Sequence, residues 1–336
     1  MSKYEKRIGL LPASKLTLEF VLGKIDQSIE KAELRVKTSR LAETPEGEVA
    51  LKYALTTGGL LSPILRFPSQ TLASNLYEDV EGNGDDNQYK KIDLIGDEIF
   101  NRLKPGFRQP YVFFVEERKR WNKVRSGNEL MVVIDPFDET SAYQKGGRVQ
   151  SSAIVILDEE AGLAASAIVN LIDQEILFIE KRREKYAVQL LTYDTDRYIL
   201  RETRLPSVIN EEIQIATLPR RISEISVLFE NIPYPQMPTF GGFGLMAVLR
   251  GETNIVFDPK KGQPWYEAVQ VGLPAEKMGL RVTDGKGHRI NWGQLIDASF
   301  KDVDIRQTIA ISNLSEVEHL KLLSDLKLPD SPLRTV

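Results

Sequence analysis

The apolar residues of this chain recur with two periods, that of a helix and that of a strand, and the two alternate along the sequence. Near the N-terminus the helical spacing of three and four is carried by Leu18, Val21, Leu22, Ile25 and Ile29. It predicts a packing helix over residues 14–41. A second helix is expected over residues 48–55 and should end at Gly58-Gly59, because paired glycines break helices. A third is predicted over residues 90–103, where the same spacing returns.

Short apolar runs rich in β-branched and aromatic residues predict buried strands. Two of them, residues 111–115 and 130–134, each end in acidic residues. Four further runs are separated by polar turn signals and indicate a largely antiparallel meander: residues 152–157, 164–172, 175–179 and 186–191. Strands mixed with helices in this way predict an α/β (α+β) fold with mixed sheets.

The second half of the chain continues this mixture after a boundary near residues 203–210. Strands are expected at residues 213–218, 225–229, 254–257, 281–284 and 308–311. Helices are expected at residues 240–249, from Glu267 onward with a kink or early end at Pro274, and after the capping box formed by Ser315 and Glu318. We therefore expect two lobes, residues 1–205 and 206–336.

Composition narrows the class of protein. With 336 residues, 42% of them hydrophobic and 27% charged, the chain is typical of a soluble globular protein. A net charge of −4 gives no general attraction to nucleic acid or to membranes, so neither is an expected partner. Residues 1–10 are too charged for a signal peptide, and no apolar run reaches the roughly 20 residues of a spanning helix, which favours a cytoplasmic protein.

The residue types that are scarce exclude some chemistry. The chain has no cysteine, which rules out disulfides and thiolate metal sites. Its only imidazoles are His288 and His319. Zinc chemistry and a Ser-His nucleophile are therefore disfavoured.

The strand at residues 130–134 runs into Asp135-Pro136-Phe137-Asp138, which carries the clearest chemical signal. The two carboxylates can flank one point, and the Phe137 carbonyl is able to face it. Hard oxygen ligands of this kind suit Mg²⁺. The alternative is an Asx-type turn in which Asp138 caps a helix.

Other polar groups would gather near this motif. Glu116 and Glu117 end the strand at residues 111–115, and acids that end parallel neighbouring strands meet at one sheet edge, where they need a cation. Asp93 either caps its helix or positions water. Lys261 and Glu267 lie either in a solvated turn or beside the same site.

Two glycine-rich segments also leave alternatives open. The acidic stretch at residues 78–87 is a mobile loop over the site or a solvated surface loop. The glycines at residues 241–244 serve helix packing or cradle a phosphate.

Four segments resemble, in the same order, those of fructose-1,6-bisphosphatase, a member of the superfamily of metal-dependent, lithium-sensitive phosphatases that includes inositol monophosphatase. They are residues 88–93, residues 115–117, Asp135-Pro136-Phe137-Asp138 and Tyr266-Glu267. The resemblance covers residues 75–157 well and residues 257–326 more loosely. It implies a layered α/β/α/β/α sugar-phosphatase fold, and homodimers or tetramers as the family forms them.

The resemblance also implies the roles of the site residues. The metal ligands would be Glu116, Asp135, Asp138, Glu267 and the Phe137 carbonyl, holding two or three Mg²⁺ ions, with Mn²⁺ as an alternative. The catalytic residues would be Asp93, Glu117 and Thr140, of which the two acids orient or deprotonate water. The substrate would be bound by Glu139, Thr140, Ser141 and Lys261. Such a site supports in-line attack of water on a phosphate ester.

This chain departs from the family pattern at three places. Glu139 stands where the family has glycine, residues 238–244 lack the arginine and tyrosine that contact sugar phosphate, and Phe257 stands where tyrosine is expected. The expected function is a Mg²⁺-dependent phosphatase acting on a sugar or polyol phosphate. The alternatives are an inositol phosphate or nucleotide 3′-phosphate phosphatase, and a catalytically degenerate binding or regulatory protein.

Overall fold

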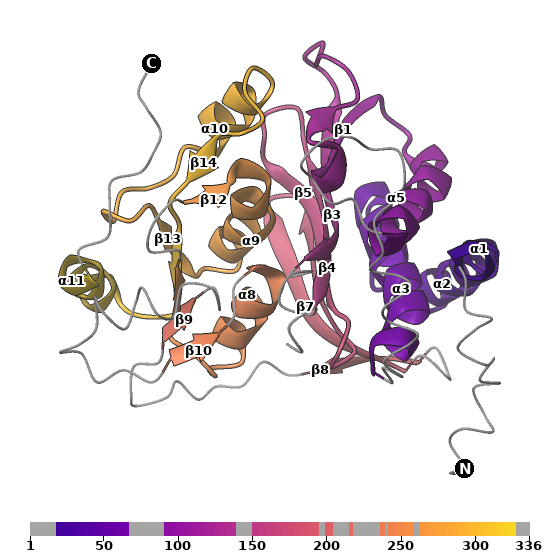
Figure 1. Ribbon diagram of the computed structural model, residues 1–336, viewed down its shortest axis with the longest axis horizontal. Helices are drawn as coiled ribbons and strands as arrows, with labels where there is room; N and C mark the ends of the chain where they lie inside the picture. Colours follow the sequence, from indigo (N-terminus) through magenta and orange to yellow (C-terminus); the bar gives the residue numbers. More distant parts are fainter. Residues whose placement is uncertain are drawn as a thin grey trace.

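The computed structural model describes residues 18–66, 91–138, 150–194, 199–203, 215–217, 236–238, 241–257 and 262–326. Helices and sheets stack in five alternating layers, helix, sheet, helix, sheet and helix (Figure 1). The layered α/β/α/β/α architecture expected from the sequence is confirmed. The expected boundary at residues 205/206, the acidic stretch at 78–87 and the strand at 225–229 lie outside the described residues.

The first helical layer covers one face of the larger sheet (Figure 1). Its helices are α1 (Leu18–Leu22), α2 (Ile25–Ser39), α3 (Pro45–Arg66) and α5 (Lys91–Leu103). The single helix expected over residues 14–41 is therefore divided after Leu22. The apolar faces of these four helices pack together against the sheet, so this side of the core is built from amphipathic helices.

The helix expected to stop at Gly58-Gly59 does not stop there, which corrects the prediction. α3 runs on to Arg66 and even includes Pro63. A Cβ built on Gly58 would lie only 2.5 Å from the ring and hydroxyl of Tyr193, a residue of the sheet. The glycine permits close packing of helix on sheet, and this tertiary contact overrides the weak local preference of glycine.

The larger sheet has eight strands in the order β2-β1-β3-β4-β5-β6-β7-β8. They are β1 (Tyr111–Val115), β2 (Arg120–Trp121), β3 (Leu130–Asp138), β4 (Ser151–Leu157), β5 (Leu163–Asn170), β6 (Glu175–Arg182), β7 (Lys185–Asp194) and β8 (Ile199–Thr203). β1 and β3 are parallel, and every other pair is antiparallel. The expected meander is confirmed as β4 to β7, whereas the edge strands β2 and β8 were not predicted.

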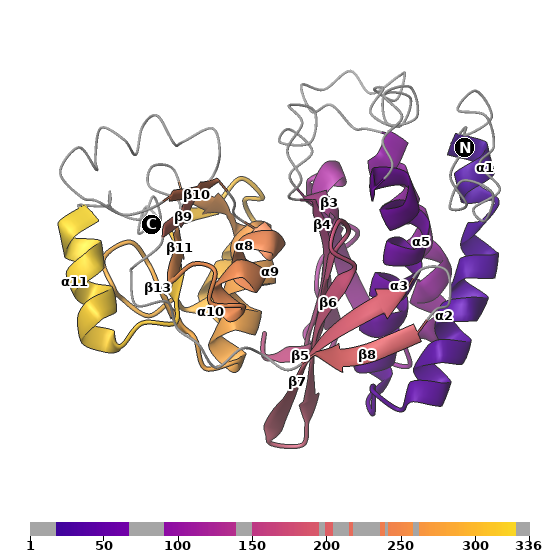
Figure 2. The same cartoon turned by 90° about the horizontal axis from the view of Figure 1, so that it is seen from below.

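The other face of this sheet carries α8 (Gly241–Leu249) and α9 (Trp265–Lys277), which separate it from a second sheet (Figure 2). That sheet has the order β10-β9-β11-β15-β13. Its strands are β9 (Ile215–Thr217), β10 (Gln236–Pro238), β11 (Ile255–Phe257), β13 (Arg281–Thr283) and β15 (Ala310–Ser312). A small pair, β12 (Gln263–Pro264) and β14 (Arg306–Gln307), lies beside α9, and α10 (Trp292–Ser299) comes between β13 and β14 along the chain.

The last layer is α11 (Glu316–Leu326), which begins as the sequence predicts. The Ser315 backbone N–H donates to Glu318 Oε2 over 3.0 Å, and the Glu318 N–H donates to Ser315 Oγ over 3.4 Å. The capping box is thus confirmed.

α9 corrects a second helix prediction. Of the kink or early end expected at Pro274, the early end is wrong, because the helix continues to Lys277. A proline inside a helix removes one backbone hydrogen bond and costs about 3 kcal/mol locally. α9 lies between two sheets with Val269, Val271 and Leu273 buried, and burial of each such side chain contributes about 2 kcal/mol. The packing therefore outweighs the proline.

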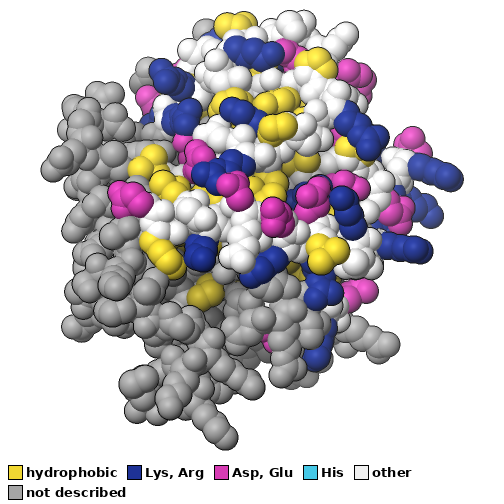
Figure 3. Space-filling model, turned by 90° about the vertical axis from the view of Figure 1, so that its right-hand side faces the viewer, with side chains coloured by type: hydrophobic (Ala, Val, Ile, Leu, Met, Phe, Trp, Pro, Cys, Tyr) yellow, Lys and Arg dark blue, Asp and Glu magenta, His cyan; other side chains and the backbone are white. Residues whose placement is uncertain are grey.

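The outer face of the first helical layer carries charges of both signs. Figure 3 shows lysine and arginine interspersed with aspartate and glutamate over this face. Lys37 pairs with Glu33, and Lys52 with Glu48, each over 3.7 Å. Such pairs keep the surface polar without creating an electrostatic potential of one sign over it. In the part of the chain that the structure describes, no helix is both long and apolar enough to cross a membrane.

Candidate active site

The two strands that end in acids are neighbours and run in the same direction. In the parallel pairing of β1 with β3, Val115 lies opposite Ile134. Glu116 and Asp135 are the next residues along the chain after this pair, so their backbones start side by side, about 4.8 Å apart. The expectation that both strands deliver acids to one edge of the sheet is confirmed at the level of the backbone.

Directly after β1 the chain turns back on itself. Glu116 begins a 3₁₀ turn, η3 (Glu116–Arg118), and the Lys119 N–H donates to the Glu116 carbonyl over 3.0 Å. Lys119 adopts the left-handed conformation, with φ of 43°, and β2 returns antiparallel to β1. Glu116, half-buried, is therefore held at a tight reversal instead of on a free loop.

Asp135 is fixed by its own surroundings. Its side chain is buried, and Oδ1 accepts a hydrogen bond from the Phe137 N–H over 3.1 Å, which forms an Asx-type turn. Its carbonyl oxygen accepts a hydrogen bond from Ser152 Oγ over 3.1 Å. The Ser152 hydroxyl lies 3.2 Å from the Tyr53 hydroxyl of α3, so a buried chain of polar groups runs from α3 to the strand end.

The end of β3 contains a β-bulge. Asp135 pairs with Ala153 and Asp138 with Ser151, so three steps along β3 match two along β4. Pro136 has no N–H to donate to the ladder, which favours an irregularity at this point. Phe137 is buried in the core on the α3 side. The bulge inserts one extra residue between the two aspartates, and it changes the direction of the strand end there.

α5 contacts both strand ends. A Cβ on Gly96 would lie 2.4 Å from Cβ of Pro136, so the helix can touch the β3 bulge only because residue 96 is glycine. The next residue, Asp97, is buried and forms an ion pair with Arg118 of η3, with Nε 3.1 Å from Oδ2. Asp93 lies in the first turn of the same helix, one turn before Asp97. One rigid element thus joins the β1 end, the β3 end and Asp93.

The sequence reasoning missed the Asp97–Arg118 pair. Two signals for it were present. Asp97 lies between Ile95 and Ile99 on a helix whose apolar residues are buried, and an arginine directly follows two glutamates. A carboxylate on a buried face requires a cationic partner, and Arg118 provides it.

α9 brings a further acid towards the site. Glu267 lies half-buried in the first turn of α9, as expected. The neighbouring Tyr266 stacks on Phe114 with ring centroids 5.2 Å apart, and Trp265 meets the same ring edge-on at 4.7 Å. Because Phe114 is only two residues before Glu116, these aromatic contacts bring the beginning of α9 to the end of β1.

The glycine-rich beginning of α8 also lies against this edge. A Cβ on Gly242 would approach Ser151 Oγ to 2.9 Å and Ile168 Cγ2 to 2.5 Å. Ser151 is the β4 residue paired with Asp138. Close packing accounts for Gly242, in agreement with the packing alternative.

The remaining candidate residues are placed less completely. For Asp93, Glu117 and Asp138 the structure gives the backbone, whereas Glu139, Thr140, Ser141 and Lys261 lie outside the described residues. Among the side chains that are described, no three acidic or imidazole groups form a metal-binding set. His319 is buried between α11 and the second sheet and His288 is on the surface, so no imidazole joins the site.

Neither a family model nor a curated protein matches the sequence. Solved structures do match the fold. A fructose-1,6-bisphosphatase from Leishmania major, in holo form, superposes with a TM-score of 0.62 at 14% identity, covering 87% of this chain and 98% of that one. An inositol monophosphatase from Zymomonas mobilis gives 0.53 at 16% identity, covering 84% and 97%.

A third solved structure is an IMPase/NADP phosphatase complexed with Mg²⁺ and phosphate, with a TM-score of 0.50 at 14% identity over 74% of this chain and 84% of that one. The chain has the fold of these phosphatases. The fold named from the sequence motifs is thereby confirmed. At these identities the likeness establishes the fold, and the chemistry has to be argued from the residues of this chain.

Proposed function

We propose that this protein is a Mg²⁺-dependent phosphatase that hydrolyses a phosphate monoester of a sugar or polyol. The observation that carries the proposal is the parallel pairing of β1 and β3, which starts Glu116 and Asp135 side by side at one edge of the sheet. Carboxylates that gather at one edge of a sheet repel one another unless a cation or hydrogen-bond donors compensate their charge. The fold shared with sugar and inositol phosphatases supports the same chemistry.

The donor set fits a hard divalent cation. Every ligand candidate is an oxygen, from Glu116, Asp135, Asp138, Glu267 and the Phe137 carbonyl, and Mg²⁺ binds through carboxylates and completes its shell with water and phosphate. When bound, two or three Mg²⁺ ions would neutralise the phosphate and activate water. An IMPase/NADP phosphatase of the same fold was solved with Mg²⁺ and phosphate.

The other candidate residues would act on water and on the substrate. Asp93 and Glu117 would orient the attacking water and accept its proton. Backbone N–H groups of Glu139 and Thr140 would donate to the phosphate, with Ser141 beside them. The Lys261 ammonium would bind a second anionic group of the substrate. These roles supply positioning and charge neutralisation, which phosphoryl transfer requires.

Glu139 motivates a second candidate function. A carboxylate in place of the usual glycine sets a negative charge beside the phosphate position, and like charges there would weaken turnover. A protein that binds a phosphorylated ligand without hydrolysing it fits this residue. Binding of a phosphate ester in the presence of Mg²⁺, with no phosphate release from any substrate tested, would favour this second function.

The test is phosphate release from phosphosugars, inositol phosphates and nucleotides, with Mg²⁺ and with EDTA. We expect release from at least one sugar or polyol phosphate, and only with Mg²⁺. Glu116→Gln and Asp138→Asn should abolish turnover, by about a thousandfold or more, because each removes a charge that holds the cation. Circular dichroism should show both variants folded. Phosphate release near the wild-type rate in either variant would contradict the assignment.

A further inference from the structure

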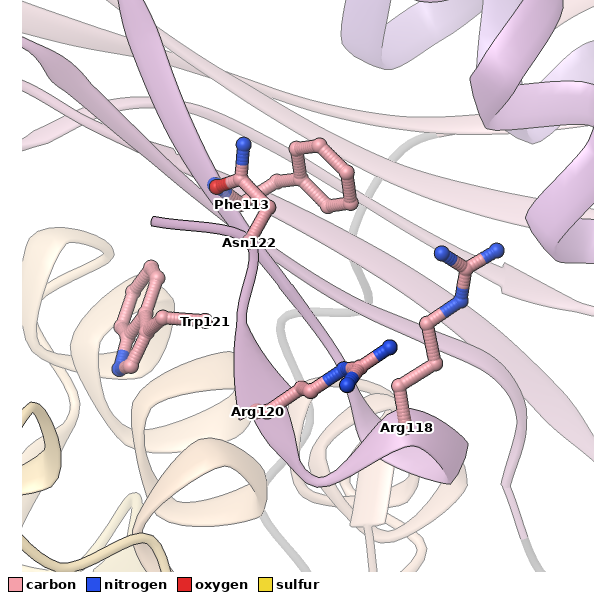
Figure 4. Close-up of a pocket in the computed structure, with 5 residues that line it drawn as sticks. All are labelled: Phe113, Arg118, Arg120, Trp121 and Asn122. Carbon is pink, nitrogen blue, oxygen red and sulfur yellow. The ribbon is translucent and has the colours of Figure 1, made fainter. Parts of the chain in front are cut away.

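A pocket of about 370 Å³ opens at the edge of the larger sheet, beside η3 and β2. It is lined by Phe113, Arg118, Arg120, Trp121 and Asn122 (Figure 4). Its volume is within the range of small-molecule sites, which begin at roughly 300 Å³. None of these residues has a role in the metal-dependent chemistry proposed above.

The lining of this pocket is cationic. Two of its five residues carry guanidinium groups and none carries a carboxylate. Arg120 is exposed, and within the described part of the chain no carboxylate pairs with it. A third cation is near, because Lys104 Nζ lies 5.8 Å from the centre of the Phe113 ring. Asp97, which pairs with Arg118, is the acid that faces this group from α5.

A second pocket gives a contrast. It measures about 440 Å³ and has both signs of charge in its lining, from Arg125, Glu159 and Asp297. Arg125 Nη1 lies 3.7 Å from Asp297 Oδ1, so its cation is already compensated. Of these two pockets in the described part of the chain, the one at Arg118 and Arg120 is better suited to an anion, because its lining holds no carboxylate and Arg120 has no acidic partner there.

The donors of the cationic pocket are held in place. Arg118 is fixed by its ion pair with buried Asp97. Arg120 lies in β2 opposite Val115, the residue before Glu116. The Asn122 Oδ1 accepts a hydrogen bond from the Phe113 N–H over 2.7 Å, and Figure 4 shows its Nδ2 turned the other way. Arg118 and Asn122 are therefore held by their contacts, whereas Arg120 is held through its backbone, so binding has to order one arginine side chain.

We propose that this pocket binds the phosphate group of a small phosphorylated molecule. Guanidinium groups match the geometry and charge of a phosphate, and the pocket is larger than a lone phosphate, so a phosphate ester fits it. Binding itself does not depend on the proposed phosphatase activity. Because the pocket lies next to Glu116, the phosphate that it binds has two possible sources. It is either a second phosphate group of the substrate or the phosphate of a separate effector molecule.

The first experiment measures binding of inorganic phosphate by calorimetry in EDTA, where the acidic site edge repels the anion. Wild-type protein should bind phosphate, and Arg120→Gln should bind it about tenfold more weakly, because one charge-assisted pair of hydrogen bonds is lost. The matched control is Arg201→Gln, an exposed arginine of β8 at the opposite edge of the sheet, which should bind as wild type does. Equal affinity in wild type and Arg120→Gln, or no binding by wild type, would overturn the proposal.

A second experiment, with Mg²⁺, separates the two sources of the phosphate. If the pocket holds a substrate group, Arg120→Gln should raise KM more for substrates with two phosphates than for those with one. If it holds an effector, a phosphorylated compound that is not hydrolysed should change the wild-type rate, and Arg120→Gln should lose that response. Absence of any phosphatase activity would refute the proposed function. The binding measurement in EDTA would then still show whether the pocket binds phosphate.

Discussion

The protonation state of a buried residue depends on the groups that surround it, and His319 is the clearest case in this protein. Its ring lies between two hydroxyls, with Ser312 Oγ 2.7 Å from Nδ1 and Thr283 Oγ1 2.8 Å from Nε2. Thr283 Oγ1 donates its own proton to the Asp284 carbonyl, so it accepts from Nε2–H, and Nδ1 accepts from Ser312. The ring is thus held neutral and links α11 to the second sheet.

Stability should therefore fall in mild acid. Burial, and secondarily the charge of Arg281, lowers the pKa of His319 from 6.5 to about 4. Between these two values the unfolded chain binds a proton that the folded chain does not, so stability is lost as the pH falls through this window. Urea unfolding at about pH 7 and about pH 5 should differ by about 2 kcal/mol from this group.

The control uses the other histidine of the chain. His288→Gln replaces an exposed ring and should keep the pH dependence, whereas His319→Gln should lose most of it. The same slope in both variants would show that His319 does not cause the effect.

At the scale of elements, α5 decides where the acids lie relative to one another. Gly96 lets the helix touch the bulge at Pro136, and Asp97 ties it to η3. The strand ends and the helix periodicity were readable from the sequence because each is a local pattern. The contact between them was not, since it joins residues distant along the chain.

Replacing the glycine at this contact should separate the elements. In Gly96→Ala the new Cβ would overlap Pro136, so we expect a loss of about 1–3 kcal/mol in the free energy of unfolding. Turnover should fall with it, because the bulge that carries Asp135 must shift. Chemical denaturation and phosphate release measure the two effects.

Gly293→Ala in α10 provides the comparison. A Cβ built there would lie 3.7 Å from Asn291 Oδ1, which is an ordinary van der Waals contact. Alanine is the better helix former by about 1 kcal/mol, so this variant should be as stable as wild type or more stable. A Gly96→Ala protein as stable as Gly293→Ala would refute the contact at Pro136.

At the scale of the whole molecule, the layers hold the candidate site together. β1 and β3 come from the larger sheet, α5 from the layer on one face and α9 from the layer on the other. Phe114 joins the sheet to α9 through Trp265 and Tyr266. The site is therefore a property of how three layers stack.

Weakening the contact between the larger sheet and α9 should lower the apparent affinity of the protein for Mg²⁺. Phe114→Leu should cost about 1–3 kcal/mol of stability and should raise the Mg²⁺ concentration needed for half-maximal phosphate release, because the beginning of α9 with Glu267 loses its anchor. Phe178→Leu is the matched control, an equally buried phenylalanine of β6 on the opposite face of the sheet. If both variants shift the Mg²⁺ requirement equally, stability alone explains the change and α9 has no positioning role.

The sequence by itself determined the elements whose signals are local. The apolar runs at β1 and β3, the helical spacing of α5 and the capping box at Ser315 each depend on a few adjacent residues, and each is found where the pattern indicates. The order of the acidic motifs along the chain also predicted the fold, because these motifs mark the strand and helix ends that the architecture brings together.

Only the tertiary structure decided the rest. α3 continues past Gly58 and α9 past Pro274, because burial against the sheets outweighs the local preference of these residues. The ion pair of Asp97 with Arg118 and the cationic pocket at Arg120 depend on which elements become neighbours. Helix and strand periods act over a few residues, whereas the contacts that build these features join segments far apart in sequence, and only packing brings those together.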